Sequence, residues 1–399
     1  MRVVLLNESF PEGMGYAGTA IPKTMRAMGV DVHYVTAGLP VYHVMPNYAE
    51  TYGEFHRNID LPGSTREVDG YQVHFLDYRL GFGGARLLGL REKLAELKPD
   101  IVQTLNHVAW PPLAAALNRR NGGYKLFTGN HTTASVYPLA RMDAGPLNPL
   151  RIKEYLIRTL PGRFISRRIE RCYGATSDCS EVARRFMGVP AEKLTTLPLG
   201  VETDLFHPAT NPEEHARAKA LREDLGVASE EIMCVYTGRF SDDKNPALLA
   251  EAVAEMRAAG APYRAVFFGE GVQRDRLAGI EGTIVRPFVH YSGLADLYRA
   301  ADIGVWPTQE STSMLDCAAS GRPIVVNDTI AAVERVEGNG LTYRLNDNDD
   351  LKRALSALQS PETRSALGSV GAAKIVAKFS WQALVQVRID DYAAAIGRV

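Results

Sequence analysis

Short runs of apolar residues alternate along the chain with longer stretches in which apolar residues recur at helical spacing. In the first half, the apolar runs predict strands at Arg2–Asn7, Asp31–Thr36, Tyr71–Leu76, Ile101–Thr104, Lys125–Gly129, Tyr173–Thr176 and Leu194–Leu197. The helical stretches between them predict helices at Thr19–Met28, Ala85–Leu97 and Pro112–Asn118. Because strands that alternate with amphipathic helices form βαβ units, the pattern predicts a parallel sheet with right-handed crossovers.

The pattern is interrupted near residue 205 and then starts again. Pro208, Pro212 and the charged stretch after them indicate an exposed linker followed by a surface helix. Beyond it, strands are predicted at Met233–Thr237, Ala265–Phe268, Ile303–Trp306 and Pro323–Val326, with helical stretches between them. We therefore expect two doubly wound α/β domains, at residues 1–205 and 206–379.

Composition and charge exclude several classes of protein. The chain has 399 residues, 46% of them hydrophobic and 23% charged, which is ordinary for a globular enzyme and wrong for a disordered chain. The 45 Lys and Arg residues balance 46 Asp and Glu residues, so no nucleic-acid partner is expected. The four cysteines show neither C-x-x-C nor zinc spacing, which is typical of reduced thiols in a cytoplasmic protein. No apolar run reaches about 18 residues, so no bilayer-spanning segment is expected.

A glycine-rich segment, Gly13-Met14-Gly15-Tyr16-Ala17-Gly18, follows the first predicted strand and matches G-x-G-x-x-G. A dinucleotide site needs its first glycine directly at the strand end and an acid at the end of the second strand. Here residues 8–12 intervene, and the second strand runs into Val35-Thr36-Ala37 without an acid. We interpret the segment as a loop that contacts a phosphate or a sugar, with an ordinary flexible connection as the alternative.

Two basic residues follow the first strand of the second domain. Arg239 and Lys244 lie five positions apart, after Gly238, on a turn that leads into a predicted helix at Pro246–Ala258. Arg offers a rigid fork of donors and Lys a mobile point charge, so the pair can converge on one diphosphate. The alternative is a pair of solvated surface residues.

The next two strand ends supply further candidates. Gly269 and Gly271 form a tight turn after the strand Ala265–Phe268. Phe288 and Val289 offer backbone groups and an aromatic edge to a flat base, and a packed loop is the alternative.

A third group surrounds the start of a predicted helix. Ser311, Thr312 and Ser313 leave backbone N–H groups open to an anion or a hydroxyl. Glu310 precedes them and Asp316 lies on the helix, so two carboxylates can grip the hydroxyls of a sugar and a ribose. The alternative is a capping acid and a surface acid.

Together these segments resemble the retaining glycosyltransferases of family 4, which have the GT-B fold of two doubly wound parallel-sheet domains facing across a cleft. The resemblance is strongest over residues 194–343 and persists in outline along the chain. Its segments, in order, are Leu199–Phe206 (similar to N-G-V-D-x-x-x-F), Gly238-Arg239 with Lys244 (G-R-x-x-x-x-K), Phe268–Gly271 (strand-end G-x-G), and Ala300–Ile303 followed by Glu310 and by Ala319–Pro323 (around the E-x7-E signature). Such an order of segments is highly specific.

The resemblance implies that the C-terminal domain holds a nucleotide-sugar donor and the N-terminal domain an acceptor. Arg239 and Lys244 would bind the donor diphosphate and stabilise the leaving nucleotide, so that neither a metal nor a cofactor is required. Glu310 would contact the donor sugar, Asp316 the ribose, and Gly15 the phosphate or sugar from the opposite wall. The remaining donor-site candidates are Gly238, Gly269, Gly271, Phe288, Val289, Ser311, Thr312 and Ser313.

The sequence departs from the family signature in one respect. The signature separates its two acids by seven residues, whereas five residues separate Glu310 from Asp316. Alignment on Gly321-Arg322-Pro323 puts Asp316 at the second acid, with a shortened loop before it. Whether Asp316 reaches the ribose, and which sugar the loop accepts, stay open.

Two histidines follow strands of the first domain. His131 comes after Lys125–Gly129 and resembles the family histidine that contacts the donor sugar near the reacting carbon. His107 follows Ile101–Thr104 and is a weaker candidate for the acceptor; a polar loop residue is the alternative for each. The N-terminal domain offers no obvious carboxylate nucleophile, so we favour front-face attack over a covalent intermediate.

Two further segments, one near the C-terminus and one rich in basic residues, also allow predictions. The segment from Phe379 to Ile396 looks like the C-terminal helix of the family, so residues 380–399 are expected to pack back on the first domain. The stretch Arg151–Arg171 interleaves basic and apolar residues, which indicates either helices with apolar faces inward or contact with an anionic membrane surface.

The sequence therefore predicts a cytoplasmic retaining glycosyltransferase that moves a sugar from a nucleotide donor to a hydroxyl of a glycan, lipid-linked or small-molecule acceptor. Two alternatives remain open. One is a nucleotide-sugar epimerase on the same architecture, and the other is an inactive nucleotide-sugar-binding protein.

Overall fold

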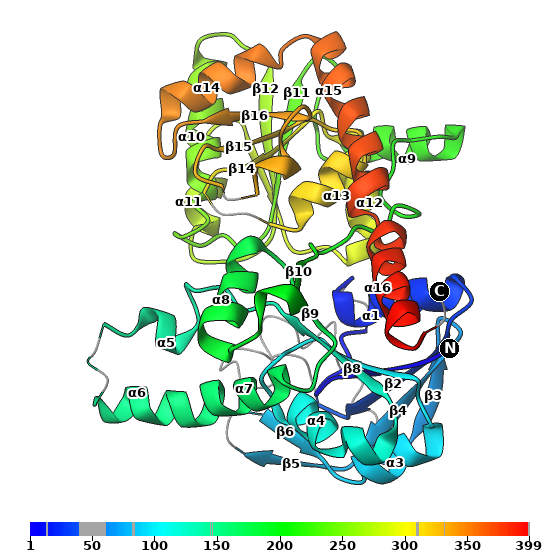
Figure 1. Ribbon diagram of the computed structural model, residues 1–399. Coiled ribbons are helices and arrows are strands. Elements are labelled where there is room, and N and C mark those ends of the chain that lie inside the picture. The colour runs from blue at the N-terminus through cyan, green and yellow to red at the C-terminus, as the bar shows by residue number, and fades with distance from the viewer. Residues whose placement is uncertain are drawn as a thin grey trace. The chain divides into compact units, whose positions relative to one another are not determined.

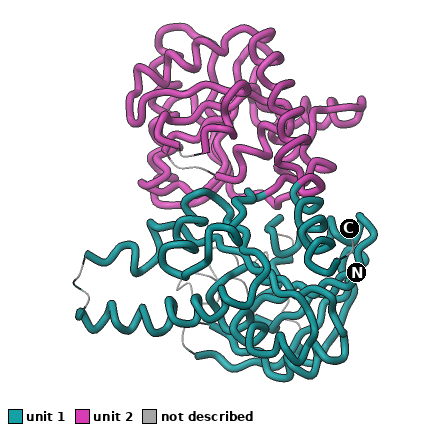
Figure 2. The backbone as a smooth tube through the Cα atoms, in the orientation of Figure 1, with its two compact units in different colours: residues 1–199, 384–399 teal, residues 200–383 magenta. Residues whose placement is uncertain are grey.

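The computed structural model describes residues 1–12, 15–39, 61–81, 84–143, 145, 147–308, 311–330 and 332–397. The chain forms two compact units, shown in different colours in Figure 2. Unit 1 contains residues 1–199 and 384–399, and unit 2 contains residues 200–383.

Unit 1 is built on an eight-stranded sheet of order β10-β9-β8-β7-β1-β2-β4-β3. Its strands are β1 (Arg2–Leu6), β2 (Asp31–Ala37), β3 (Thr65–Val68), β4 (Tyr71–Leu76), β7 (Ile101–Thr104), β8 (Lys125–Asn130), β9 (Arg171–Gly174) and β10 (Leu194–Thr196). All neighbours pair in parallel except β3 and β4, which are antiparallel. A separate antiparallel hairpin joins β5 (Tyr78–Gly81) to β6 (Gly84–Leu87).

The helices of unit 1 lie on both faces of this sheet (Figure 1). They are α1 (Ala17–Ala27), α3 (Leu90–Leu97), α4 (Trp110–Gly122), α5 (Pro138–Arg141), α6 (Pro149–Glu154), α7 (Leu160–Ser166) and α8 (Ser177–Met187), with a π-helical turn η1 (Tyr155–Thr159) between α6 and α7 and a 3-10 turn η2 (Ala191–Lys193). Leu94, Val102, Leu126 and Val182 belong to one buried core, which joins the inner faces of α3 and α8 to the sheet.

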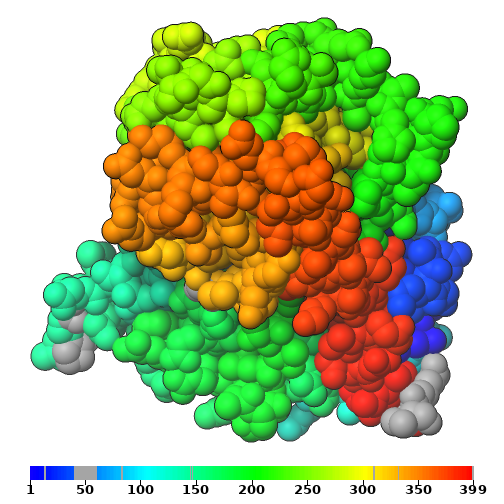
Figure 3. Space-filling model, turned by 90° about the horizontal axis from the view of Figure 1, so that it is seen from above, coloured from blue at the N-terminus to red at the C-terminus, as the bar shows by residue number. Residues whose placement is uncertain are grey.

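Unit 2 has a six-stranded sheet of order β13-β12-β11-β14-β15-β16, in which every pair is parallel. Its strands are β11 (Ile232–Thr237), β12 (Tyr263–Phe268), β13 (Thr283–Arg286), β14 (Ile303–Trp306), β15 (Ile324–Asn327) and β16 (Gly340–Tyr343). Its helices are α9 (Pro212–Asp224), α10 (Pro246–Ala258), α11 (Arg274–Ala278), α12 (Leu294–Ala300), α13 (Ser313–Ala319), α14 (Asn348–Ala357) and α15 (Pro361–Lys374), with short turns η3 (Tyr291–Gly293), η4 (Val333–Arg335) and η5 (Ile375–Phe379). Helices α14 and α15 form part of its outer surface (Figure 3).

The chain passes between the units twice. Helix α16 (Trp381–Ala395) begins in unit 2, and its residues from Leu384 onward belong to unit 1. Within unit 2 the two passages are bonded to each other, because the Val201 N–H donates to the Phe379 carbonyl and the Trp381 N–H donates to the Val201 carbonyl. In unit 1 the Tyr392 hydroxyl bonds the Gln103 side chain, and the Tyr173 hydroxyl donates to the Asp391 carboxylate at 2.9 Å.

Two sequence predictions are wrong in detail. The helix predicted at Ala85–Leu97 starts only at Leu90, after Gly89 in a left-handed conformation, and residues Gly84–Leu87 pair with β5 instead. The strand predicted at Tyr173–Thr176 ends at Gly174, because Thr176 caps α8 by accepting the Cys179 N–H at 3.1 Å. In the part of the chain that the structure describes, no helix is both long and apolar enough to cross a membrane.

Candidate functional site

The strand order of unit 2 contains one switch point. From β11 the chain continues outward through β12 and β13, and it then returns to the other side of β11 to form β14, β15 and β16. The loops that follow β11 and β14 therefore leave the sheet in opposite directions. In open parallel sheets, ligands bind outside the carboxyl ends of the strands at such a point.

The loop after β11 carries the two predicted phosphate ligands. Arg239 directly follows Gly238, its side chain is 58% exposed, and its guanidinium lies 3.9 Å from the Asp243 carboxylate. Lys244 lies in a tight turn, because the Lys244 and Asn245 N–H groups both donate to the Ser241 carbonyl. Helix α10 then begins at Pro246. Both cations thus stand on one short loop at the switch point.

The glycines after β12 allow the loop after β12 to lie against the loop after β11. A Cβ atom on Gly269 would stand 1.8 Å from the Gly238 carbonyl oxygen, and one on Gly271 would stand 2.6 Å from the Phe240 carbonyl oxygen. The backbones are also bonded, since the Gly238 N–H donates to Phe268 and the Phe240 N–H donates to Glu270. Only residues without a Cβ permit this approach of the two loops.

The buried side chain of Gln273 supports the same pair of loops. Its Nε2 donates to the Asp242 carboxylate at 2.8 Å, and its Oε1 accepts the Ala247 N–H at 3.3 Å. Phe288 and Val289 follow β13, the next strand outward. The candidates after β11, β12 and β13 therefore lie at one edge of the sheet.

The loop after β14 lies on the other side of the switch point. Ser311 and Thr312 precede α13, which starts at Ser313, and the Ser313 N–H donates to the Ser311 hydroxyl at 3.3 Å. Glu310 lies outside the described residues.

Thr308 is a residue that the sequence reasoning did not consider. Seven residues separate it from Asp316, which is the spacing of the family signature. Its hydroxyl donates to the Asp243 carbonyl at 2.6 Å, and its carbonyl accepts the Asn327 side-chain amide at 2.7 Å. Thr308 therefore joins the two loops that flank the switch point, and counting back from Asp316 would have found it.

Asp316 lies in the first turn of α13 and is only 6% exposed. Burial, with a smaller contribution from the negative charge of Glu202, raises the pKa of the Asp316 carboxyl well above its usual range. The neighbouring Tyr291 and Tyr298 hydroxyls also have raised pKa values, mainly through burial and secondly through Asp316. A ribose contact by Asp316 stays a prediction, and it requires ligand access to a largely covered carboxyl.

This burial predicts a pH dependence of stability. The folded protein holds a proton on Asp316 that the unfolded chain releases near pH 4, so stability falls as pH rises from that value through the raised pKa. We expect Asp316→Asn to have a higher melting temperature than the wild type at pH 8, with the difference vanishing below pH 4. Melting curves across this range provide the check, and equal curves for both proteins at pH 8 would contradict it.

In unit 1 the two predicted histidines differ in environment. His131 directly follows β8 and is exposed at the strand end. His107 is fully buried, with its Nδ1 2.9 Å from the Thr128 hydroxyl and its Nε2 3.0 Å from the Ser166 hydroxyl, and burial lowers its pKa to about 4. An acceptor contact by His107 stays a prediction, and it requires the ring to leave these partners.

Gly15 has φ +64° in the loop before α1, whereas Gly13 and Met14 lie outside the described residues. Across the described ranges, no three His, Cys, Asp or Glu side chains gather as metal ligands would.

The basic stretch Arg151–Arg171 is helical as far as Ser166, and its helical part has a partly exposed apolar side. Leu156 is 52% and Leu160 44% exposed, whereas Ile165 is buried in the core. Arg163 and Arg168 lie over the rings of Tyr155 and Phe164. The alternative in which the apolar side chains of this stretch pack inward therefore holds for some of them and not for Leu156 and Leu160.

Comparison with known proteins bears on both units. Residues 20–205 match the family model described as Glycosyltransferase Family 4, and residues 231–360 match the model described as Glycosyl transferases group 1. Among curated proteins, the chain is 26% identical over 277 residues to a D-inositol 3-phosphate glycosyltransferase of Xylanimonas cellulosilytica, covering 66% of each chain. It is 28% identical over 250 residues to the protein of that name from Geodermatophilus obscurus, covering 57% of this chain and 53% of the other. The chain thus spans between half and two thirds of these relatives.

Solved structures are similar over the full length. Sucrose-phosphate synthase from Thermosynechococcus elongatus superposes with a TM-score of 0.68 at 16% identity and covers 100% of both chains. HepE of Anabaena, solved in complex with UDP and glucose, gives 0.67 at 15% identity and covers 99% of this chain and 100% of that one. These likenesses confirm the expected fold of two doubly wound domains.

Proposed function

Because this chain belongs to the family 4 glycosyltransferases and has their GT-B fold, we propose that it transfers a sugar from a nucleotide-sugar donor to a hydroxyl acceptor. Unit 2 is the donor domain in this proposal, and unit 1 holds the acceptor. The relatives named above are glycosyltransferases, and HepE was solved with UDP and glucose. Neither the epimerase nor the inactive binding protein is favoured by these matches.

The observation that carries the proposal is the clustering of the donor candidates at one switch point. Arg239 and Lys244 follow β11, Gly269 and Gly271 follow β12, and Ser311–Ser313 follow β14 on the other side. A diphosphate placed there meets two cations on a single loop, and the glycines allow close approach of the backbone. Asp316 is the proposed ribose ligand, and Phe288 and Val289 are the proposed contacts of the base.

In the proposed reaction the two cations stabilise charge on the leaving group. As the bond between the anomeric carbon and the phosphate oxygen breaks, negative charge develops on the diphosphate, and Arg239 and Lys244 neutralise it. This role makes the proposed transfer independent of a metal ion. The acceptor oxygen then bonds to the same face of the anomeric carbon and passes its proton to the departing phosphate oxygen, which retains the configuration. His131 and Glu310 are the proposed contacts of the donor sugar.

A direct test incubates the purified protein with UDP-, GDP- and ADP-sugars, with and without cell-extract acceptors, and follows nucleotide release. We expect release that depends on the acceptor, unchanged by added EDTA. NMR of the product at the anomeric position reports retention. Formation of a new nucleotide-sugar isomer without acceptor would instead identify an epimerase, and tight binding without turnover would identify an inactive protein.

A further inference from the structure

Unit 1 has its own switch point, between β1 and β7. From β1 the sheet grows through β2 and β4 on one side and through β7, β8 and β9 on the other. The loop after β1 contains Glu8, and the loop after β7 leads to Trp110 at the start of α4. The carboxyl ends of these two strands are therefore where this sheet opens to a ligand.

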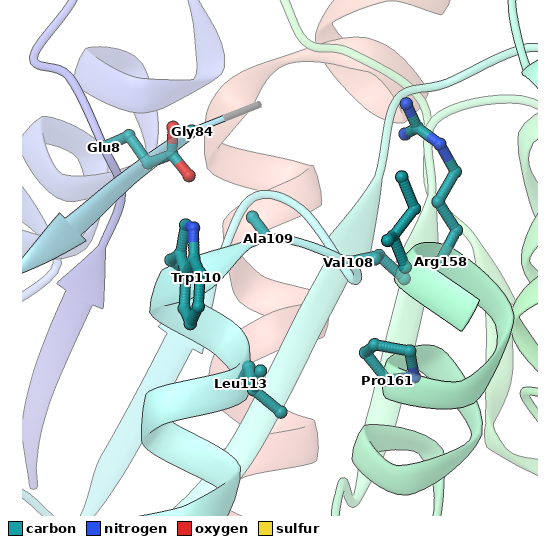
Figure 4. Close-up of a pocket in the computed structure, with 9 residues that line it drawn as sticks. Glu8, Gly84, Val108, Ala109, Trp110, Leu113, Arg158 and Pro161 are labelled. Carbon is teal, nitrogen blue, oxygen red and sulfur yellow. The ribbon is translucent and has the colours of Figure 1, made fainter. Parts of the chain in front are cut away.

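A cavity of about 240 Å³ lies at this point. Figure 4 shows Glu8 and Arg158 on opposite sides of it, with Trp110 and Leu113 between them. The residues that line it are Glu8, Gly84, Val108, Ala109, Trp110, Leu113, Ile157, Arg158 and Pro161. Most of these side chains are apolar, and the charged ones are Glu8 and Arg158. A lining of this kind, with few polar groups, is typical of a site for an organic ligand.

The walls of the cavity are fixed by contacts within unit 1. The Trp110 Nε1 donates to the Gly81 carbonyl at 2.9 Å, so the indole ring has a set orientation. The Glu8 carboxylate lies against Gly84, where an added Cβ atom would stand 2.6 Å from Oε1. On the far side, the Arg158 Nε donates to the Glu154 carboxylate at 2.5 Å. The cavity is therefore preformed.

The wall that carries Arg158 also bears the exposed apolar residues. Ile157 and Arg158 belong to the π-helical turn η1, and π-helical turns are frequent at functional sites. Leu156 and Leu160, beside them in sequence, are exposed. Apolar surface therefore occurs both inside the cavity and on the outside of the same helical segment.

We propose that this cavity binds the apolar part of an amphipathic acceptor, whose hydroxylated head lies between Glu8 and Arg158. The proposal rests on the proposed function, because it names the class of molecule that receives the sugar. Trp110, Leu113 and Ile157 bury an alkyl or aryl group, and the removal of this apolar surface from water favours binding. The carboxylate and the guanidinium bond the hydroxyls of the head.

Binding is tested without any donor, so that its failure is distinct from failure of the proposed transfer. The probe is octyl β-D-glucoside below its micelle concentration, with glucose as the headgroup control. The readout is tryptophan fluorescence, because Trp306 and Trp381 are buried and Trp110 is the half-buried tryptophan that lines the cavity. We expect a saturable change with octyl glucoside, none with glucose, and loss of the signal in Trp110→Phe.

Two variants and a matched control identify the binding place. Leu113→Asn is expected to weaken binding about tenfold, which corresponds to 1.4 kcal/mol. Ala109→Phe fills part of the cavity with a larger side chain without removing core contacts. It is expected to abolish binding. Leu117→Asn, on the same helix but exposed and outside this cavity, is the control and binds as the wild type. Equal curves for octyl glucoside and glucose, or wild-type affinity in Ala109→Phe, would overturn the proposal.

A membrane lipid and a soluble amphiphile can both supply an apolar part and a hydroxylated head. Cosedimentation with vesicles distinguishes these two sources. Cosedimentation with vesicles of phosphatidylcholine and phosphatidylglycerol, weakened by salt, supports an acceptor drawn from an anionic membrane. Octyl glucoside binding without cosedimentation supports a soluble amphiphilic acceptor.

Discussion

Arg239→Ala is expected to lower turnover of the nucleotide sugar by about a hundredfold to a thousandfold. The guanidinium stands directly after β11 at the switch point of unit 2, and its side chain is 58% exposed, so it is available to a bound diphosphate. Loss of one donor to a developing negative charge typically costs this factor in kcat. Because the charge grows as the bond breaks, kcat falls more than the affinity for the nucleotide. Lys244→Ala is expected to act in the same direction.

Arg276→Ala is the matched control for this experiment. Arg276 is also in unit 2, is 57% exposed and pairs with Glu251, but it lies on α11 rather than on a strand-end loop. It should keep wild-type turnover and nucleotide affinity. Steady-state rates of nucleotide release, with nucleotide affinity measured by calorimetry, separate the two effects. Near-normal rates in both Arg239→Ala and Lys244→Ala would refute their role at the phosphate.

Gly269→Ala is expected to destabilise unit 2 by at least about 3 kcal/mol and to remove donor binding. The new Cβ atom would stand 1.8 Å from the Gly238 carbonyl oxygen, and a backbone atom cannot move aside as a flexible side chain does. Overpacking of this kind costs roughly 1–3 kcal/mol, or more where a backbone must shift. To relieve the clash, the loops after β11 and β12 must move apart. Arg239 then moves with the loop after β11.

Gly279→Ala provides the comparison for Gly269→Ala. A Cβ atom at Gly279 meets its nearest neighbour, the Asp275 carbonyl, at 3.5 Å, which is ordinary van der Waals contact, and φ is −83°. We expect its unfolding free energy to stay within about 0.5 kcal/mol of the wild type, as at a tolerant surface site. Urea denaturation followed by circular dichroism measures both variants. The steric argument fails if Gly269→Ala unfolds at the same urea concentration as Gly279→Ala.

The central strands could be predicted from sequence, whereas the edge strands β3 and β13 could not. β11 is buried at every position, so a run of apolar residues marks it. β13 is half-buried throughout, and β3 alternates between exposed and half-buried residues, so neither leaves a clear apolar run. β3 is also antiparallel to β4, which a pattern of alternating strands and helices does not indicate. The pattern thus predicts the core of each sheet better than its margins.

The two candidate sites also differ in how far the sequence predicts them. Residues of the donor loops follow strands directly, and parallel strands bring their carboxyl ends to one edge, so Arg239 and Gly269 could be grouped from the amino-acid sequence alone. The cavity of unit 1 joins Glu8, Trp110 and Arg158, which are far apart in the chain and meet only through the strand order and the π-helical turn. No local spacing encodes that meeting.

The double passage of the chain determines the order in which the protein is completed. Residues 384–399 belong to unit 1, and the Tyr392 hydroxyl bonds Gln103 while Asp391 accepts from Tyr173. On the ribosome, residues 1–199 emerge before residues 384–399, so the surface that the latter segment covers in unit 1 stays uncovered until residues 200–383 have been synthesised. Unit 1 can therefore be completed only after unit 2 has been synthesised, although most of its residues precede unit 2 in the chain.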